Sequence, residues 1–229
     1  MSANWDATAY DVVSDPHVEW AKAVLERLPL SGHETVLDAG CGTGRVTELL
    51  VERLPHGRVI AVDGDANMVA KARERFGDRV RVEHQDLLEL DVGTPVDAIF
   101  SNAVFHWIPD HDTLFRRLHA ALRPSGRLVA QCGGHGNIDK VREVSGPGPW
   151  LYATGEETEE RLRAASFQEA KGWLEPWPVV PPDPRTFLAT VCLRTVPDDE
   201  RELMIDRVLA NLGDPPTLDY VRLNIDAVA

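Results

Sequence analysis

The chain is short of cysteine and of long apolar runs. Its 229 residues include only three cysteines, Cys41, Cys132 and Cys192, and their scattered positions have no metal-ligand spacing. An odd number of cysteines argues against a disulfide framework, and the spacing argues against a bound metal. No apolar run approaches the ~20 residues of a membrane-spanning helix, and the first residues lack the basic and apolar regions of a secretory signal. We therefore expect a cytoplasmic protein without a membrane partner.

Positive charge is also scarce. Lysine and arginine number 24 against 37 aspartates and glutamates, which gives a formal net charge of −13. Nucleic-acid binding normally draws on a concentrated basic surface, so we expect no nucleic-acid partner. A small anionic substrate remains compatible, because it needs only one or two local arginines. The length and the hydrophobic content of 43% suit one α/β domain with a substantial core.

Short β-type runs alternate with helical runs from Thr35 to Gly133, which is typical of βαβ units on a parallel sheet. Runs rich in valine and isoleucine lack strict alternation, as expected of strands covered on both faces. The strands expected in this part are Thr35–Asp38, Arg58–Asp63, Val80–His84, Ala98–Ser101 and Arg127–Cys132. The helices expected between them are Arg45–Arg53, Asn67–Phe76 and Asp112–Leu122.

The flanking segments are predicted with less regular structure. Residues 3–30 are expected to form a helix or two across the carboxyl edge of the sheet, and residues 124–126 a turn before the fifth strand. Residues 133–149 are rich in glycine and proline and predict a loop with at most a short helix. Five prolines make residues 176–184 irregular. The remaining elements expected are the helices Glu156–Ser166 and Glu200–Leu212 and the strands Phe167–Leu174 and Leu218–Ala227.

The most informative motif is the run Val36–Gly44, in which an apolar strand leads into Asp38 and three alternating glycines. Glycines fold the backbone sharply and leave no Cβ to block a ligand. The following helix start favours an anionic group on its backbone N–H groups. A dinucleotide-binding loop would need a glycine at Arg45, so the spacing argues against NAD.

Polar residues follow the next strand ends, where an open α/β sheet binds its ligands. Asp63 is placed to accept hydrogen bonds from ribose hydroxyls, and Asp86 from an adenine amine, with Met68 and Leu87 over the ring faces. Asn102 ends the fourth strand. Each residue also has an ordinary alternative: Asp63 would cap a helix, Asp86 would begin a turn, and Met68 would be helix core.

Together these motifs resemble the class I S-adenosylmethionine (SAM) dependent methyltransferases. Asp38–Gly44, Asp63 and Gln85–Leu87 match their cofactor motifs in order. Ser101–His111, together with Trp5 and Tyr10 upstream, resembles the trans-aconitate methyltransferase group. The resemblance implies SAM as cofactor and S-adenosylhomocysteine as product. The cofactor residues it implies are Asp38, Gly40, Cys41, Gly42, Gly44, Asp63, Gly64, Met68, Asp86, Leu87 and Asn102.

The resemblance also implies a Rossmann-like seven-stranded sheet of order 3-2-1-4-5-7-6, with the last strand antiparallel and helices on both faces. We expect one domain over residues 1–229: a helical lid in 1–30, a SAM-binding core in 31–133, and acceptor-side helices with closing strands in 134–229.

The acceptor side differs from the group it resembles. The trans-aconitate enzymes typically have glutamine where this chain has His106, and residues 134–137 also depart from their pattern. His106 is the candidate general base, because its ordinary pKa of about 6.5 suits that role; alternatively it shapes the pocket or orients a carboxylate. His111 and His119 are expected at the surface. Further candidates for the acceptor site or lid are Trp5, Tyr10, Trp107, His135 and Trp150, and no metal is expected.

We therefore predict a small-molecule methyltransferase that acts on the oxygen of a carboxylate or a hydroxyl group. Two alternatives stay open. The fold binds SAM without transferring its methyl group, or the acceptor is a macromolecule. The sequence does not determine the acceptor or the oligomeric state.

Overall fold

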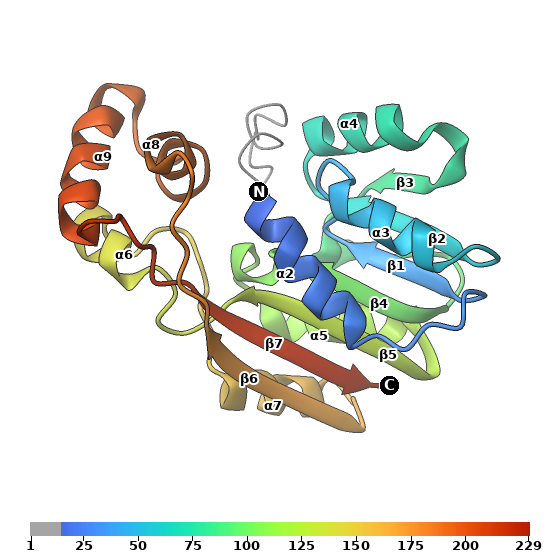
Figure 1. Cartoon of the computed structure of the whole chain (residues 1–229). Helices are drawn as coiled ribbons and strands as arrows, with labels where there is room; N and C mark the ends of the chain where they lie inside the picture. Colours follow the sequence, from blue (N-terminus) through green and yellow to red (C-terminus); the bar gives the residue numbers. More distant parts are fainter. Residues whose placement is uncertain (1–14) are drawn as a thin grey trace.

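The computed structural model describes residues 15–229, which form a seven-stranded sheet with helices on both faces and a separate helical group at one end (Figure 1). The strand order is β3-β2-β1-β4-β5-β7-β6, and β7 alone runs antiparallel to its neighbours, as predicted. The strands are β1 (Thr35–Ala39), β2 (Arg58–Asp63), β3 (Arg81–His84), β4 (Val96–Asn102), β5 (Leu122–Gly133), β6 (Glu169–Pro176) and β7 (Val221–Val228).

Helices with apolar residues at helical spacing cover each face of the sheet. On α5 (His111–Ala121), the residues Leu114, Phe115 and Leu118 are fully buried in the cluster that also holds α7 (Gly155–Ala164). On the opposite face lies a second cluster, to which α2 (Asp15–Glu26), α3 (Arg45–Arg53) and α4 (Ala66–Phe76) contribute. Coverage of both faces explains why the inner strands carry continuous apolar runs.

The helix α2 lies over a face of the sheet and not across its carboxyl edge, which corrects the sequence prediction. Its buried side chains pack with β1, β4 and β5. Arg27, just after the helix, donates from Nε to Asp226 at 3.0 Å, from Nη1 to Asn224 at 2.8 Å and from Nη2 to the carbonyl of Ala130 at 2.9 Å. These bonds fasten α2 to β5 and β7. The remainder of the proposed lid, with Trp5 and Tyr10, lies outside the described residues.

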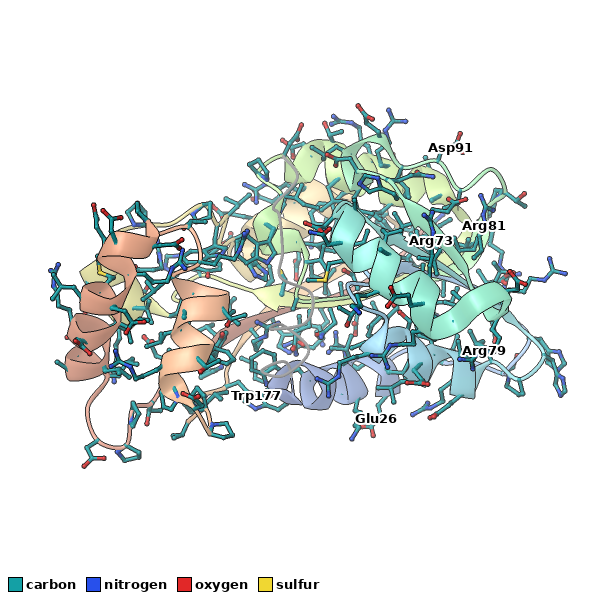
Figure 2. All side chains as sticks on the ribbon, turned by 90° about the horizontal axis from the view of Figure 1, so that it is seen from above. Glu26, Arg73, Arg79, Arg81, Asp91 and Trp177 are labelled. Atoms are coloured by element: carbon teal, nitrogen blue, oxygen red, sulfur yellow. The ribbon has the colours of Figure 1, made fainter. Side chains whose placement is uncertain are left out.

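A helical cap stands at the end of the sheet where β7 begins (Figure 1). It consists of α6 (Asp139–Ser145), α8 (Pro184–Phe187), the π-helix η4 (Leu188–Cys192) and α9 (Asp198–Leu212), which share one apolar cluster. Trp20 of α2 joins this cluster, and its ring contacts Trp177 at 6.4 Å between centroids. Seen from above, Trp177 lies beside the start of α2, on the side of the cap (Figure 2). The cap therefore packs on α2 as well as on the sheet.

Two irregular segments differ from the sequence prediction. The expected turn at residues 124–126 lies inside β5, where Ser125 adopts a φ of +63° and the pairing with β4 shifts its register. The helix α8 and the π-helix follow directly on the proline-rich segment, because Pro184 occupies the first helical turn, where a missing N–H costs nothing. Among the described residues, no helix is long and apolar enough to cross a membrane.

Candidate functional site

The glycine run forms a tight loop between β1 and α3. The N–H groups of Gly40 and Cys41 both donate to the carbonyl of Val62, at 2.8 and 3.0 Å. Gly40, Gly42 and Gly44 have φ values of +87°, +55° and +87°, which side chains rarely adopt. A Cβ at Gly40 would lie 2.2 Å from Val104, and a Cβ at Gly44 would lie 2.4 Å from Phe76. At Gly42 it would meet nothing within 4 Å. Two of the glycines serve packing, and Gly42 leaves open space for a ligand.

Asp63, at the end of β2, holds this loop. Its carboxylate accepts from the N–H of Gly42 at 2.8 Å and from the N–H of Asp65 at 2.9 Å. The residue that caps α4 is Asp65 and not Asp63. Asp65 accepts from the N–H groups of Asn67 and Met68 at the start of this helix. The structure therefore brings Asp63 and the glycine loop together at the carboxyl ends of β1 and β2.

The site is rich in buried negative charge. Asp38 is 2% exposed, and burial raises its pKa to about 7 although it accepts a hydrogen bond from Thr47 Oγ1 at 2.7 Å. Burial also raises the pKa of Asp63 and of the Cys41 thiol. A cationic ligand would stabilise such carboxylates, because a nearby positive charge favours their ionised form and lowers their pKa. The ammonium and sulfonium groups of SAM fit this charge pattern, and Gly42 gives the backbone approach it needs.

The residues expected to bind adenine make mainly structural contacts. Asp86 is exposed and caps the short helix η2 (Leu87–Glu89) by accepting from the N–H of Leu88 at 2.9 Å, as the turn alternative expected. Leu87 and Met68 are each 4% exposed, and Leu87 packs in the core cluster under α5. The carbonyl of Gly64 lies 3.1 Å from His84 Nε2. Roles for Asp86, Leu87 and Met68 in adenine binding, and for Gly64 in cofactor binding, stay predictions.

The end of β4 turns sharply into the acceptor side. Ala103 has a φ of +62°, and its N–H donates to the carbonyl of Gln131 on β5 at 2.7 Å. A non-glycine residue in this region stores strain, and such residues cluster at functional sites. The turn follows Asn102 and starts the short helix η3 (Phe105–Trp107), so it sets the position of His106.

His106 is 8% exposed, and its ring is oriented by the backbone. The N–H of Gly133, at the end of β5, donates to His106 Nδ1 at 3.2 Å. Because Nδ1 accepts a hydrogen bond, the neutral ring carries its hydrogen on Nε2. The carbonyl of His106 in turn accepts from the N–H of Leu151 at 2.9 Å, which brings residues 150–152 to the site.

Trp107, Trp150 and Tyr152 gather around His106, and we refer to these three residues as the aromatic group. His106 lies 5.3 Å from Trp107 and 5.9 Å from Tyr152 between ring centroids. Trp150 stands edge-on to Trp107 at 5.7 Å and stacks on Tyr152 at 5.7 Å with an angle of 11°. Such walls suit an organic acceptor of low molecular weight.

Two other histidines differ from expectation. His135 is exposed, and its N–H donates to the carbonyl of Ala153 at 2.9 Å, but its ring has no recorded contact with the aromatic group. His111 is 2% exposed, with Nε2 3.0 Å from the carbonyl of Phe105, so its predicted surface position is wrong. The helix α5 begins at His111, which turns this ring inward under η3. In the part of the chain that the structure describes, no group of histidine, cysteine, aspartate or glutamate residues could hold a metal.

The sequence prediction missed two contributors. Thr47, one turn into α3, holds Asp38, and threonine at this place carries no distinguishing signal in one sequence. Arg194 of the cap lies with its guanidinium carbon 4.8 Å from the Trp107 ring centroid. Its distance in sequence from residues 102–107 leaves no local pattern to detect, since only the tertiary fold brings the two segments together.

Comparisons with known proteins agree with this geometry. A family model described as a methyltransferase domain matches residues 36–126, which contain the glycine loop, Asp63 and His106. A solved structure of the YcgJ protein from Bacillus subtilis superposes with a TM-score of 0.71 at 15% identity, over 93% of this chain and 98% of that one. At that identity the match supports the fold alone.

Two curated relatives are trans-aconitate 2-methyltransferases. The protein of Methylobacterium nodulans is 36% identical over 177 residues, which cover 75% of this chain and 67% of that protein. The protein of Azoarcus sp. is 42% identical over 151 residues, or 64% of this chain and 58% of that protein. The matched regions thus span about two thirds of the relatives' lengths or less. The chain belongs to the class I SAM-dependent methyltransferases, in the trans-aconitate methyltransferase group, whose cofactor is SAM.

Proposed function

We propose that the protein transfers the methyl group of SAM to a carboxylate oxygen of a small organic acid. In this proposal Asp38, Asp63 and the glycine loop hold the cofactor, and the aromatic group encloses the acceptor. The observation that favours a carboxylate over a hydroxyl acceptor is the hydrogen bond from the Gly133 N–H to His106 Nδ1. A ring oriented in this way donates through Nε2 and does not take up a proton there. An acceptor that is already ionised needs no base.

The reaction balances without a proton. A lone pair on the carboxylate oxygen forms the new O–CH₃ bond while the S–CH₃ bond breaks. The electron pair of the broken bond stays on sulfur and neutralises the sulfonium. The protein has to align the three atoms, and such orientation is worth about 7–11 kcal/mol when the geometry is right. A hydroxyl acceptor would instead lose a proton, for which the site would need a base. Proton release therefore distinguishes the two acceptor types.

The direct test is turnover with SAM in weakly buffered solution, using trans-aconitate, the substrate named for the relatives, beside a monocarboxylic acid and a phenol. We expect S-adenosylhomocysteine and a methyl ester from a carboxylic acid, with no proton released per turnover. Stoichiometric proton release with the phenol as the favoured acceptor would overturn the choice of carboxylate. Tight SAM binding without turnover of any acceptor would favour a role other than methyl transfer, and turnover of a macromolecule alone would favour that class.

The variant His106→Gln separates the roles of this side chain. Glutamine keeps a side-chain donor, so we expect it to retain much of kcat and to change mainly KM. A general base would instead lose about 10²–10⁴ in rate. His119→Gln, the same change on the far part of α5 beside Phe167, is the matched control. A fall in kcat beyond about a hundredfold, with SAM affinity intact, would reinstate base catalysis.

A further inference from the structure

Arg194 stands on a loop whose backbone is held by hydrogen bonds from Arg201. The loop follows the π-helix η4 and leads into α9. Arg201 of α9 donates to the carbonyls of Leu193 and Arg194 at 3.3 Å each and to the carbonyl of Val196 at 2.6 Å. Its Nη1 also pairs with Asp198 at 2.7 Å. One arginine thus fixes the backbone from which the other extends, which limits the region that the Arg194 side chain can reach.

The side chain of Arg194 crosses from the cap to the edge of the sheet. Its guanidinium lies over Trp107, whose ring contacts both His106 and Trp150. The charge of Asp65, next to the predicted ribose-binding Asp63, also acts on it, although burial has the larger effect and lowers the pKa of Arg194. The half-buried cation therefore lies between the predicted cofactor edge and the aromatic group.

Two other arginines near the aromatic group have different settings. Arg142 lies 5.3 Å from the Tyr152 ring centroid and pairs with Asp139 of its own helix α6 at 2.6 Å. Arg222 is 1% exposed on β7, where it stacks on Trp20 at 4.3 Å and donates to Gln131 at 3.2 Å. Its stacking partner Trp20 belongs to α2, and Gln131 belongs to β5. Arg194, in contrast, lies over the ring of Trp107, the neighbour of His106.

We propose that Arg194 is a specificity-determining residue that binds a carboxylate of the acceptor other than the one that is methylated. This inference rests on the proposed function. A guanidinium presents a planar pair of N–H groups that matches a carboxylate, and stacking on an aromatic ring keeps that plane in position. The cation then selects acceptors with at least two carboxylates and turns one of them toward the methyl group.

The test measures binding of acids that share a five-carbon main chain and differ in the number of carboxylates. Tricarballylate, glutarate and pentanoate carry three, two and one. Each is titrated by calorimetry into protein saturated with S-adenosylhomocysteine, for the wild type, Arg194→Gln and Arg142→Gln. We expect Arg194→Gln to weaken tricarballylate by about 10- to 100-fold, the scale of a lost charge-assisted hydrogen bond, and to leave pentanoate unchanged. Arg142→Gln should behave as the wild type.

Four other results are informative. Equal weakening of all three acids by Arg194→Gln, or an equal effect of Arg142→Gln, would overturn the proposal in favour of a structural role. Weaker S-adenosylhomocysteine binding by Arg194→Gln, with acid binding unchanged, would assign Arg194 to the cofactor and overturn it too. Binding of acids to the wild type without any ester from SAM would instead refute the proposed function, which the turnover arm reports separately.

Discussion

The cofactor half and the acceptor half of this molecule are built by different means. At the ends of β1 and β2, the predicted cofactor site consists of backbone N–H groups, left-handed glycines and two carboxylates from neighbouring segments of the sequence. On the acceptor side, side chains from η3, from residues 150–152 and from the helical cap meet around one histidine. A site made of backbone tolerates little change, whereas a site made of side chains from distant segments changes its specificity without loss of the fold.

The largest expected effect separates the two kinds of glycine in the cofactor half. Gly42→Ala is strained at a φ of +55°, but its Cβ would lie in open space. The protein should therefore fold with a modest loss of stability and lose SAM affinity by about 100-fold or more, close to 2.7 kcal/mol. Gly40→Ala drives a Cβ to 2.2 Å from Val104 and should destabilise the fold itself, on the order of 1–3 kcal/mol. Calorimetry with SAM and thermal unfolding measure the two effects. If both variants kept the SAM affinity of the wild type, the predicted cofactor site would be refuted.

An opposite pattern is expected on the acceptor side. Trp150→Ala removes a ring that contacts Trp107 and Tyr152 and should raise the acceptor KM by about tenfold or more, the scale of one to two lost aromatic contacts. SAM affinity should stay at the wild-type value. A matching loss of SAM affinity would show that the two halves are coupled through the aromatic group.

Asp38 sharpens the comparison through pH. Its folded pKa of about 7 lies above the value of about 3.9 for an unfolded aspartate, so the folded state binds the extra proton between these values. Its contribution to stability therefore falls as the pH rises from about 4 to about 7, and the penalty is complete above that range. Asp38→Asn removes this penalty while keeping an acceptor for Thr47. The ligand-free variant should gain thermal stability over the wild type at pH 8 and gain less at pH 5; an equal difference at both would contradict the assignment.

The smallest effect is expected on the outside of the cap. Arg185 of α8 pairs with Glu202 and Asp206 of α9 at 2.7 and 2.6 Å, and all three side chains are largely exposed. Exposed ion pairs contribute little, because water and salt screen them. Arg185→Ala should leave the Tm and both substrate affinities unchanged. A clear fall in acceptor affinity would show that the cap is less self-supporting than its apolar cluster suggests.

The sequence predicted the sheet, because strands and helices depend on local patterns. It also named the residues of the cofactor half, and their role in binding SAM stays a prediction. Strand order followed from the family resemblance, and Asp38 and Asp63 stand where the glycine spacing places them. The acceptor half was predicted only in part. His106 and Trp107 adjoin β4 and were named, whereas Arg194 was missed because its place depends on how the cap packs. His111 was misplaced because its polar side chain suggested the surface, although it stands three and four residues before Leu114 and Phe115 and shares their buried face.

If SAM binds beside Asp38 as predicted, its binding is coupled to the release of a proton from this buried carboxyl group. Near neutral pH a substantial share of the ligand-free molecules carries a proton on Asp38, since its pKa is about 7. Once the positive groups of SAM lie nearby, the ionised form is favoured and the proton leaves to the solvent. The measured enthalpy of binding would then depend on the ionisation enthalpy of the buffer, and affinity would rise with pH across this range. The protein would therefore bind SAM more weakly as the pH falls below about 7.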